Sequence, residues 1–395
     1  MVPETQIPTT AFVVEKPGAP FVLQNVVLDE VRSNEVLVEM KYTGLCHTRT
    51  QDSQDIVVQQ GGMPVGDFPA VLGHEGAGIV RRVGNKVTDK SLKEGDLVFL
   101  SFSSCCEKTC TPCGEDRHGF CDQMTSINFG GARGLHASDS PISFPDGKGP
   151  IRGQFFGQSS MSKLAVVDQR SVVKTPSASG ITVEDMAFLA PLGCGYLTGA
   201  GTVFNVLKPK AGSKFVVFGM GAVGLAALFA ARSQGVETII AVDIVDAKLK
   251  LAKSFGASHT LNTKSIPDVA QALLEISPGG VDCVLDTTGV VPLLEAGVKA
   301  LGHEGILSLV GVPRPGASMN INPLDLMTGC KRIVGAIEGC SNPALIVPQL
   351  IDLYKQGKFP VDKLAKIYTP DTFEQAISDL HSGNVIKPII KWSDL

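Results

Sequence analysis

The sequence predicts a two-part α/β protein in which a β-rich first part precedes a doubly wound α/β domain. Up to about residue 175, the apolar segments are short and β-branched, and turn residues separate them. From about residue 183, continuously apolar strands alternate with helical patterns, as in a parallel sheet covered on both faces. The length of 395 residues is typical of two domains.

The composition favours a globular enzyme. The formal net charge of −4 gives no basic footprint for nucleic acid or anionic membranes. The 43 Gly and 24 Pro indicate many turns, and a hydrophobic share of 44% argues against disorder. The N-terminal residues lack a signal-peptide pattern, and no apolar run approaches the roughly 18 residues that span a bilayer. We therefore expect a cytoplasmic protein without nucleic-acid or membrane partners.

The first part is predicted to consist almost entirely of strands, because period-2 segments rich in Val and Ile alternate with Gly, Pro, Asn and Asp. The expected strands are 11–14, 21–28, 35–42, 76–84, 96–102 and 162–168. The stretch from 125 to 160 is rich in Gly, Ser and Pro and long enough to be a functional surface loop.

The second part alternates between strands and helices. A long helix is expected over 183–207 at its start. The expected strands that follow are 214–218, 238–244, 281–289 and 305–312, and the expected helices are 222–234, 246–255, 266–277 and 290–301. Near the C-terminus, 342–357 and 370–383 read as helices, and 385–392 reads as a strand that could extend the second part or return to the first.

A glycine-rich turn predicts a dinucleotide site in the second part. The motif GMGAVG follows a strand, opens a helix and is followed 19 residues later by Asp243 at the end of the next strand. Its candidate residues are Gly219, Gly221, Ala222, Val223 and Gly224. The glycines let a pyrophosphate approach the helix N-terminus, and Asp243 can accept both ribose hydroxyls while repelling a 2′-phosphate. We expect a Rossmann domain that binds NAD rather than NADP.

Ten cysteines occur in a chain with no sign of export, and five of them lie between residues 105 and 121. Cys110, Cys113 and Cys121 form a compact thiolate set to which Cys105 or Cys106 can add a fourth ligand; Glu107 could also take that place. Four thiolates in a polar loop predict a closed, structural zinc site.

A second metal site is predicted from residues far apart in the sequence. Cys46, His74 and Cys194 would supply two thiolates and one imidazole, which leaves a fourth position open as in a catalytic zinc site. Each residue alone is more typical of a protein core, but their joint occurrence beside a nucleotide fold favours the metal.

At this point the motifs are recognisable as a family pattern. In order, GLCHT, GHEGAGIV, the cysteine lobe, LGCG and GMGAVG resemble the zinc-dependent medium-chain alcohol dehydrogenases over nearly the whole chain. FFGQSSM and APLGCGYLTGAG look most like the aryl-alcohol (benzyl alcohol) dehydrogenase branch. The resemblance implies a GroES-like catalytic domain, 1–194 plus 339–395 with the zinc lobe at about 105–121, and a Rossmann domain at 195–338. It also implies a homodimer or homotetramer.

The resemblance assigns catalytic roles position by position. Cys46, His74 and Cys194 match the catalytic zinc ligands. Thr48 matches the hydroxyl that passes the alcohol proton outward, and Glu75 matches a carboxylate behind the zinc that can become a transient ligand. Cys110, Cys113 and Cys121 match the structural lobe, with Cys106 as the expected fourth ligand.

Coenzyme contacts are implied in the same way. His47 matches a side chain near the pyrophosphate, and Thr198 lies where the family contacts the nicotinamide region. Lys248 matches a ribose contact, and the backbone of Val310 to Pro313, which includes Val312, matches the segment that holds the carboxamide.

Three departures from the family pattern stand out. Glu107 occupies the usual place of the first lobe cysteine, so Cys106 or Cys105 must reach in. Arg49 replaces an acid that steadies the zinc-bound imidazole, a loss that typically costs ~10–100-fold in metal affinity or activity; Asp52 could compensate. Gln51 replaces a relay histidine, so the proton would leave by another route.

The sequence thus predicts an oxidoreductase that uses two zinc ions and NAD to interconvert an alcohol and its aldehyde, with an aromatic or bulky primary alcohol as substrate. Two alternatives are a zinc-independent quinone or enoyl reductase of the same architecture and a catalytically silent NAD-binding protein.

Overall fold

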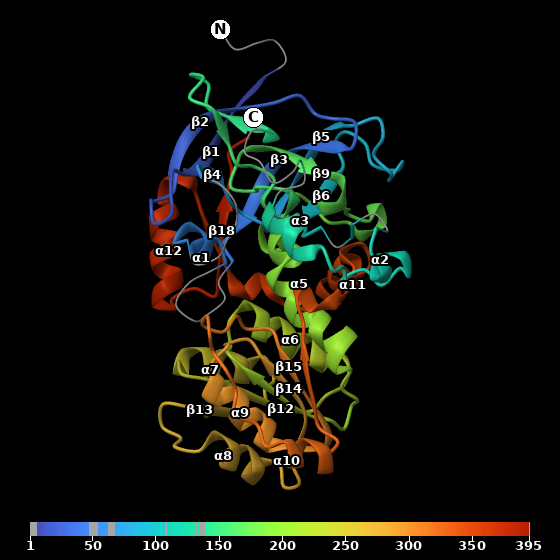
Figure 1. The fold of residues 1–395 in the computed structure, drawn as a ribbon, viewed down its shortest axis with the longest axis vertical. Coiled ribbons are helices and arrows are strands. Elements are labelled where there is room, and N and C mark those ends of the chain that lie inside the picture. The colour runs from blue at the N-terminus through green and yellow to red at the C-terminus, as the bar shows by residue number, and fades with distance from the viewer. Residues whose placement is uncertain are drawn as a thin grey trace.

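The computed structural model describes residues 6–46, 54–61, 68–103, 105–106, 109–130, 133 and 139–394. A strand-rich part carries both chain ends, and a parallel α/β part lies below it in Figure 1. Helix α5 (Gly195–Gly201) lies where the two parts meet.

Two sheets build the strand-rich part. The first has the order β4 (Ala70–Val71), β1 (Ile7–Val14), β2 (Val22–Leu28), β7 (Ile142–Ser143), β8 (Pro150–Ile151). The second has the order β10 (Val172–Lys174), β6 (Leu97–Leu100), β5 (Gly76–Val83), β3 (Glu35–Gly44), β18 (Lys387–Lys391), β17 (Ala365–Tyr368), and β9 (Leu164–Asp168) also pairs with β3. All ten residues of β3 are buried, since other strands and the adjoining helices cover it.

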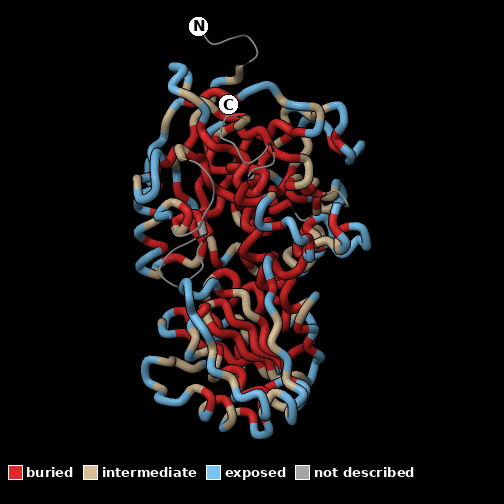
Figure 2. The backbone as a smooth tube through the Cα atoms, in the orientation of Figure 1, coloured by how far each residue is buried: buried red, intermediate tan, exposed pale blue. Residues whose placement is uncertain are grey.

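The α/β part is one six-stranded parallel sheet. Its order is β13 (His259–Asn262), β12 (Thr238–Asp243), β11 (Lys214–Phe218), β14 (Val281–Asp286), β15 (Leu301–Leu309), β16 (Arg332–Gly335). Its connections contain α6 (Ala222–Ser233), α7 (Asp246–Ser254), α8 (Val269–Ile276), α9 (Val291–Ala300) and α10 (Pro323–Thr328). The central strands form the buried layer visible in Figure 2. The predicted fold class is confirmed, although the sequence did not reveal β13, β16 or α10.

The predicted long helix over 183–207 is wrong as a single element. The segment divides into α4 (Met186–Leu189), the 3-10 turn η5 (Ala190–Gly193), α5 and the π-helical turn η6 (Thr202–Leu207). Pro191 lies at the start of η5, and Cys194 has φ −146° and ψ −86°, outside the helical region. These two residues end one helix and start another at the position of a predicted metal ligand.

The predicted surface loop over 125–160 is also wrong for its last ten residues. Its first residues form α3 (Met124–Gly130), and 151–160 are all buried, including the 3-10 turn η2 (Phe155–Gly157). Backbone N–H groups of Phe155 and Gly157 find acceptors within the turn and in Ser159, so this irregular segment can lie inside the protein.

The C-terminal segments return to the first part. Helices α11 (Pro343–Lys355) and α12 (Phe373–Ser382) form as predicted, and β18 pairs antiparallel with β3 through Ile389 and Gly44. The remaining short elements are α1 (Gln54–Gln59), α2 (Thr111–Gly114), η3 (Gln169–Ser171), η4 (Ser177–Ser179), η7 (Glu338–Cys340), η8 (Val361–Leu364) and η9 (Pro370–Thr372). In the described part of the chain no one helix meets the length and hydropathy expected of a membrane span; the pair Met186–Gly193 and Gly195–Leu207, bent by 61°, does so only when taken together.

Candidate active site

Three separate segments bring Cys46, His74 and Cys194 together. Cys46 follows β3, His74 lies between β4 and β5, and Cys194 precedes α5. All three are buried, and their ligand atoms lie within 4.8 Å of one another. The backbone directly before Cys194 packs closely against Leu100, because a Cβ on Gly193 would lie 1.8 Å from the carbonyl oxygen of Leu100.

The imidazole of His74 is oriented so that one nitrogen faces this cluster. Its Nδ1 lies 3.0 Å from Asp55 Oδ1, whereas Nε2 is buried and has no hydrogen-bond partner among the described residues. Burial alone lowers the pKa of His74, but the Asp55 carboxylate and the Cys46 thiol raise that pKa well above its ordinary value. A buried nitrogen without a partner, beside two thiols, is the donor set that a zinc ion requires.

Asp55 was not among the predicted site residues. It lies in α1, is 1% exposed and also accepts a hydrogen bond from the Gly73 backbone N–H at 3.1 Å. It therefore supplies the carboxylate partner of His74 that Arg49 cannot supply. Sequence inspection pointed to Asp52 instead, because a separation of 19 residues between Asp55 and His74 carries no local signal.

Six of the residues named from the sequence lie outside the described part of the chain. They are His47, Thr48, Arg49, Gln51, Asp52 and Glu107.

Glu75 lies next to His74 and is completely buried. Both of its carboxylate oxygens contact Lys387 Nζ, at 2.9 and 2.8 Å, and Oε1 accepts the Gly195 backbone N–H at 3.1 Å. Burial raises the pKa of Glu75 to about 7, although the Lys387 ammonium opposes this shift. Lys387 comes from β18, so the C-terminal strand neutralises a charge in the site; the sequence analysis did not identify it.

A second unpredicted carboxylate lies on the other side of Cys194. Glu338 Oε1 accepts from Cys194 Sγ at 3.5 Å, and Glu338 Oε2 accepts from Thr198 Oγ1 at 2.9 Å. Burial raises the pKa of Glu338 to about 7, while the nearby His74 and the Thr198 hydroxyl act in the opposite direction. Thr198 itself is 8% exposed, on the first turns of α5.

Three phenyl rings form an aromatic wall beside His74. The Phe156 and Phe155 ring centroids lie 4.8 and 5.8 Å from that of His74, and Phe129 packs edge-on against both. Gln158 fixes this segment because its amide donates to the His74 carbonyl at 3.0 Å. All three rings are buried and pack an apolar surface against His74.

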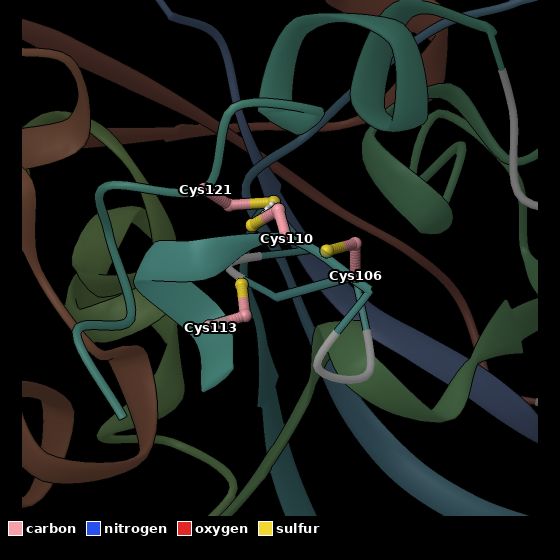
Figure 3. A group of neighbouring side chains, drawn as sticks. All are labelled: Cys106, Cys110, Cys113 and Cys121. Atoms are coloured by element: carbon pink, nitrogen blue, oxygen red, sulfur yellow. Dashed lines mark hydrogen bonds between the residues drawn. The ribbon is translucent and has the colours of Figure 1, made fainter. Parts of the chain in front are cut away.

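The cysteine lobe forms a second cluster. The side chains of Cys106, Cys110, Cys113 and Cys121 point toward one another (Figure 3), and their sulfur atoms lie within 4.8 Å of one another. Cys110 and Cys113 belong to α2 and its N-cap. All four are buried.

The two alternatives to Cys106 are placed differently. Cys105 is partly exposed and is not one of the four clustered thiols, and Glu107 lies outside the described residues. The geometry therefore favours Cys106 as the fourth member.

The glycine-rich turn opens onto a cavity of about 530 Å³ in the α/β part. Of the residues predicted to bind coenzyme, those that line it are Gly219, Gly221, Ala222, Val223, Asp243 and Lys248. Gly224 packs behind the turn, where a Cβ would lie 1.9 Å from the Gly219 carbonyl oxygen. Val310 and Val312 follow β15 outside this lining; the Val310 N–H is bonded to the Asp286 carbonyl at 3.0 Å.

The carboxylate of Asp243 also shapes the turn. Oδ2 accepts the Met220 N–H at 2.7 Å, and Oδ1 accepts the N–H groups of Ile244 and Val245 at 2.7 and 2.9 Å. The side chain therefore lies at the mouth of the turn, as the dinucleotide fingerprint requires.

Comparison with known proteins agrees with this architecture. Residues 32–177 match the alcohol dehydrogenase GroES-like domain, and residues 222–356 match the zinc-binding dehydrogenase domain. A geraniol dehydrogenase from Castellaniella defragrans is 35% identical, over 97% of this chain and 98% of the relative. An S-(hydroxymethyl)glutathione dehydrogenase from Paracoccus denitrificans is 32% identical, over 97% of this chain and 99% of the relative.

Solved structures extend the likeness to three dimensions. The benzyl alcohol dehydrogenase from Acinetobacter calcoaceticus superposes with a TM-score of 0.88 and is 40% identical, covering 98% of this chain and 100% of that one. The family and fold class predicted from the motifs are confirmed. With similarity of this extent along nearly its whole length, the chain belongs to the zinc-binding alcohol dehydrogenases.

Proposed function

We propose that this chain uses NAD and two zinc ions to interconvert an aromatic or other bulky primary alcohol and its aldehyde. The observation that carries the proposal is the convergence of two buried thiols and the unpartnered Nε2 of His74 beside the aromatic wall of Phe129, Phe155 and Phe156.

Each residue of the candidate active site would have a separate role. Cys46, His74 and Cys194 would hold a zinc ion, and Asp55 keeps the proton of His74 on Nδ1 so that Nε2 is available. Zinc, when bound, polarises the alcohol and lowers the pKa of its hydroxyl. Thr48 is assigned the outward transfer of the hydroxyl proton by the family resemblance.

The aromatic wall would position the substrate. Its rings pack an aromatic or branched chain against the His74 side of the site, which orients the carbinol carbon and excludes water. The geraniol and benzyl alcohol dehydrogenases among the relatives act on substrates of this kind according to their names, which supports the same class here.

The α/β part would bind the coenzyme, which supplies the hydride acceptor. Gly219, Gly221, Ala222 and Val223 would hold the pyrophosphate at the N-terminus of α6, and Gly224 would let the helix pack closely behind the turn. We assign the adenosine ribose to Asp243 and Lys248, the pyrophosphate side to His47, and the nicotinamide to Thr198 and the backbone of Val310 and Val312.

The second zinc would be structural. Cys106, Cys110, Cys113 and Cys121 would occupy all four positions of a tetrahedral ion, so this site stabilises the lobe and leaves no position for substrate. The division into a catalytic domain (1–194 and 339–395) and a coenzyme domain (195–338), the cytoplasmic location and the homodimer or homotetramer expected from the family stay predictions.

Zinc content tests the proposal without knowledge of the substrate. Elemental analysis should give two zinc ions per wild-type chain and one each for Cys46→Ser and Cys113→Ser, and Cys46→Ser should lose alcohol oxidation while binding NADH normally. One zinc in wild type that is retained in Cys46→Ser would contradict the proposal and favour the metal-free reductase alternative.

A further inference from the structure

Glu338 is held in a strained and fixed turn. The backbone φ angles of Glu338, Gly339 and Cys340 are +48°, +59° and +48°, all in the left-handed region. For a residue other than glycine this conformation is unfavourable and persists only where the surroundings impose it. The Asn205 amide does so here, because it donates to the Gly339 carbonyl at 3.0 Å and to Ser341 Oγ at 3.1 Å.

Within the described residues, the carboxylate that this turn presents has no lysine or arginine partner. Glu338 is 7% exposed, and within the described residues only Thr198 and Cys194 donate to it, with no lysine or arginine in contact. Glu75 differs, because Lys387 already contacts both of its oxygens. Buried carboxylates are normally paired with a cation or bound to a metal, so the absent charge needs an explanation.

A metal ion held by Cys46, His74 and Cys194 would supply that positive charge. Once Cys194 binds a metal as a thiolate, it no longer has a proton to donate, and Glu338 Oε1 loses its partner. In a tetrahedral zinc site, a thiolate at about 2.3 Å and a carboxylate oxygen at about 2.0–2.2 Å from the ion lie roughly 3.5 Å apart. The distance between Cys194 Sγ and Glu338 Oε1 is also 3.5 Å, but Glu338 is not among the residues whose ligand atoms all lie within 4.8 Å of one another, so its carboxylate has to move toward the ion.

We propose that Glu338 is a further carboxylate of the catalytic metal site, which approaches the ion from the Cys194 side and strengthens its retention. This inference rests on the proposed function, because it assumes that Cys46, His74 and Cys194 hold a metal. The fixed turn sets the position of the Glu338 backbone, and the side-chain torsions leave the carboxylate free to adjust its distance from the ion. Glu75 and Glu338 would then differ in role, with the first neutralised by Lys387 and the second by the metal.

Cobalt binding tests the proposal without any turnover. Metal-free protein is titrated with Co²⁺ in the absence of NAD and alcohol, and the signal of the catalytic site is taken as the part that Cys46→Ser removes. For Glu338→Gln, which keeps the size and the Thr198 contact, we expect the dissociation constant of this site to rise about tenfold or more. We also expect its d–d absorption bands to shift, because the ligand set changes.

Glu39→Gln is the matched control. Glu39 is a fully buried carboxylate of β3 that pairs with Lys41 and Arg81, away from the metal cluster. Its Co²⁺ affinity should equal that of wild type. An equal loss in both variants, or a Glu338→Gln protein with the wild-type affinity and spectrum, overturns the role of Glu338. A wild-type protein with no Co²⁺ signal sensitive to Cys46→Ser would instead refute the proposed function itself.

Discussion

Removal of the Asp55 carboxylate tests how the imidazole of His74 is held. Asp55 Oδ1 accepts hydrogen bonds from His74 Nδ1 at 3.0 Å and from the Gly73 N–H at 3.1 Å, and both contacts are buried. Asp55→Ala leaves both donors without an acceptor and frees the ring to turn. Asp55→Asn keeps an acceptor oxygen of the same size but without the charge.

The expected magnitude follows from these two contacts. Loss of a carboxylate behind a metal-binding histidine typically costs ~10–100-fold in metal affinity, which corresponds to ~1.4–2.7 kcal/mol. Two buried donors without partners destabilise the metal-free protein by ~1–3 kcal/mol each. A hydrogen bond to a charged acceptor is roughly twice as strong as one to a neutral acceptor. We therefore expect Asp55→Asn to lose about half as much zinc-binding free energy and unfolding free energy as Asp55→Ala loses.

The assay is competition for zinc between the protein and a chromophoric chelator, with thermal unfolding of the metal-free protein measured separately. The zinc affinities should rank wild type, Asp55→Asn, Asp55→Ala, from tightest to weakest. Asp146→Ala is the surface control. Within the described residues the Asp146 carboxylate forms a salt bridge with the exposed Lys148, so its removal should leave the zinc affinity unchanged. An Asp55→Ala protein that binds zinc within about twofold of wild type would refute this reasoning, since the expected loss is at least about tenfold.

Three further predictions concern the coenzyme site and the C-terminal helix. Asp243→Asn should lower the ratio of kcat/KM for NAD over NADP by about tenfold or more, because a like charge beside a 2′-phosphate costs several kcal/mol; an unchanged ratio would place the selectivity elsewhere. Gly224→Ala should weaken NADH binding in a fluorescence titration, since its Cβ would meet a carbonyl oxygen at 1.9 Å, whereas Gly212→Ala, with no atom within 4 Å, should bind as wild type; equal affinities in both variants would contradict the close packing. Hydrogen bonding to Lys366 helps to lower the pKa of Asp379 from 3.8 to about 2, so its stabilisation is present above about pH 4 and is lost as the pH falls toward 2. The melting-temperature difference between wild type and Asp379→Asn should therefore be larger at pH 7 than at pH 2, and a constant difference would exclude this contribution.

The alternation of strands and helices was predictable because it depends on local periodicity. The helix after Gly221 and the strand that ends at Asp243 follow from the apolar pattern and the glycine-rich turn. The break at Cys194 was not predicted, since the apolar residues around it keep a helical pattern while Pro191 and the backbone of Cys194 interrupt the hydrogen bonds. The burial of 151–160 was missed because the Gly, Ser and Pro content of 125–160 indicates a surface loop, whereas the Gln158 amide donates to the His74 and Ser101 carbonyls inside the protein.

The site residues also separate into those that local sequence patterns reveal and those that tertiary contacts bring into place. Cys46, His74 and Cys194 could be named from the sequence because their residue types and order carry the chemistry. Asp55 and Glu338 could not, because a carboxylate acquires its role from what it faces, and both are brought to the metal cluster by tertiary contacts. Neither lies within a recognisable motif.

The active site is complete only after strand β18, which lies near the C-terminus, has been synthesised. The ammonium of Lys387 reaches Glu75 only when β18 has paired with β3. A ribosome releases residue 387 long after residues 46, 74 and 194, so the nascent chain holds all three candidate zinc ligands before Glu75 has its counter-ion. The site with a neutralised Glu75 is therefore expected only after residue 387 has left the ribosome and β18 has paired with β3.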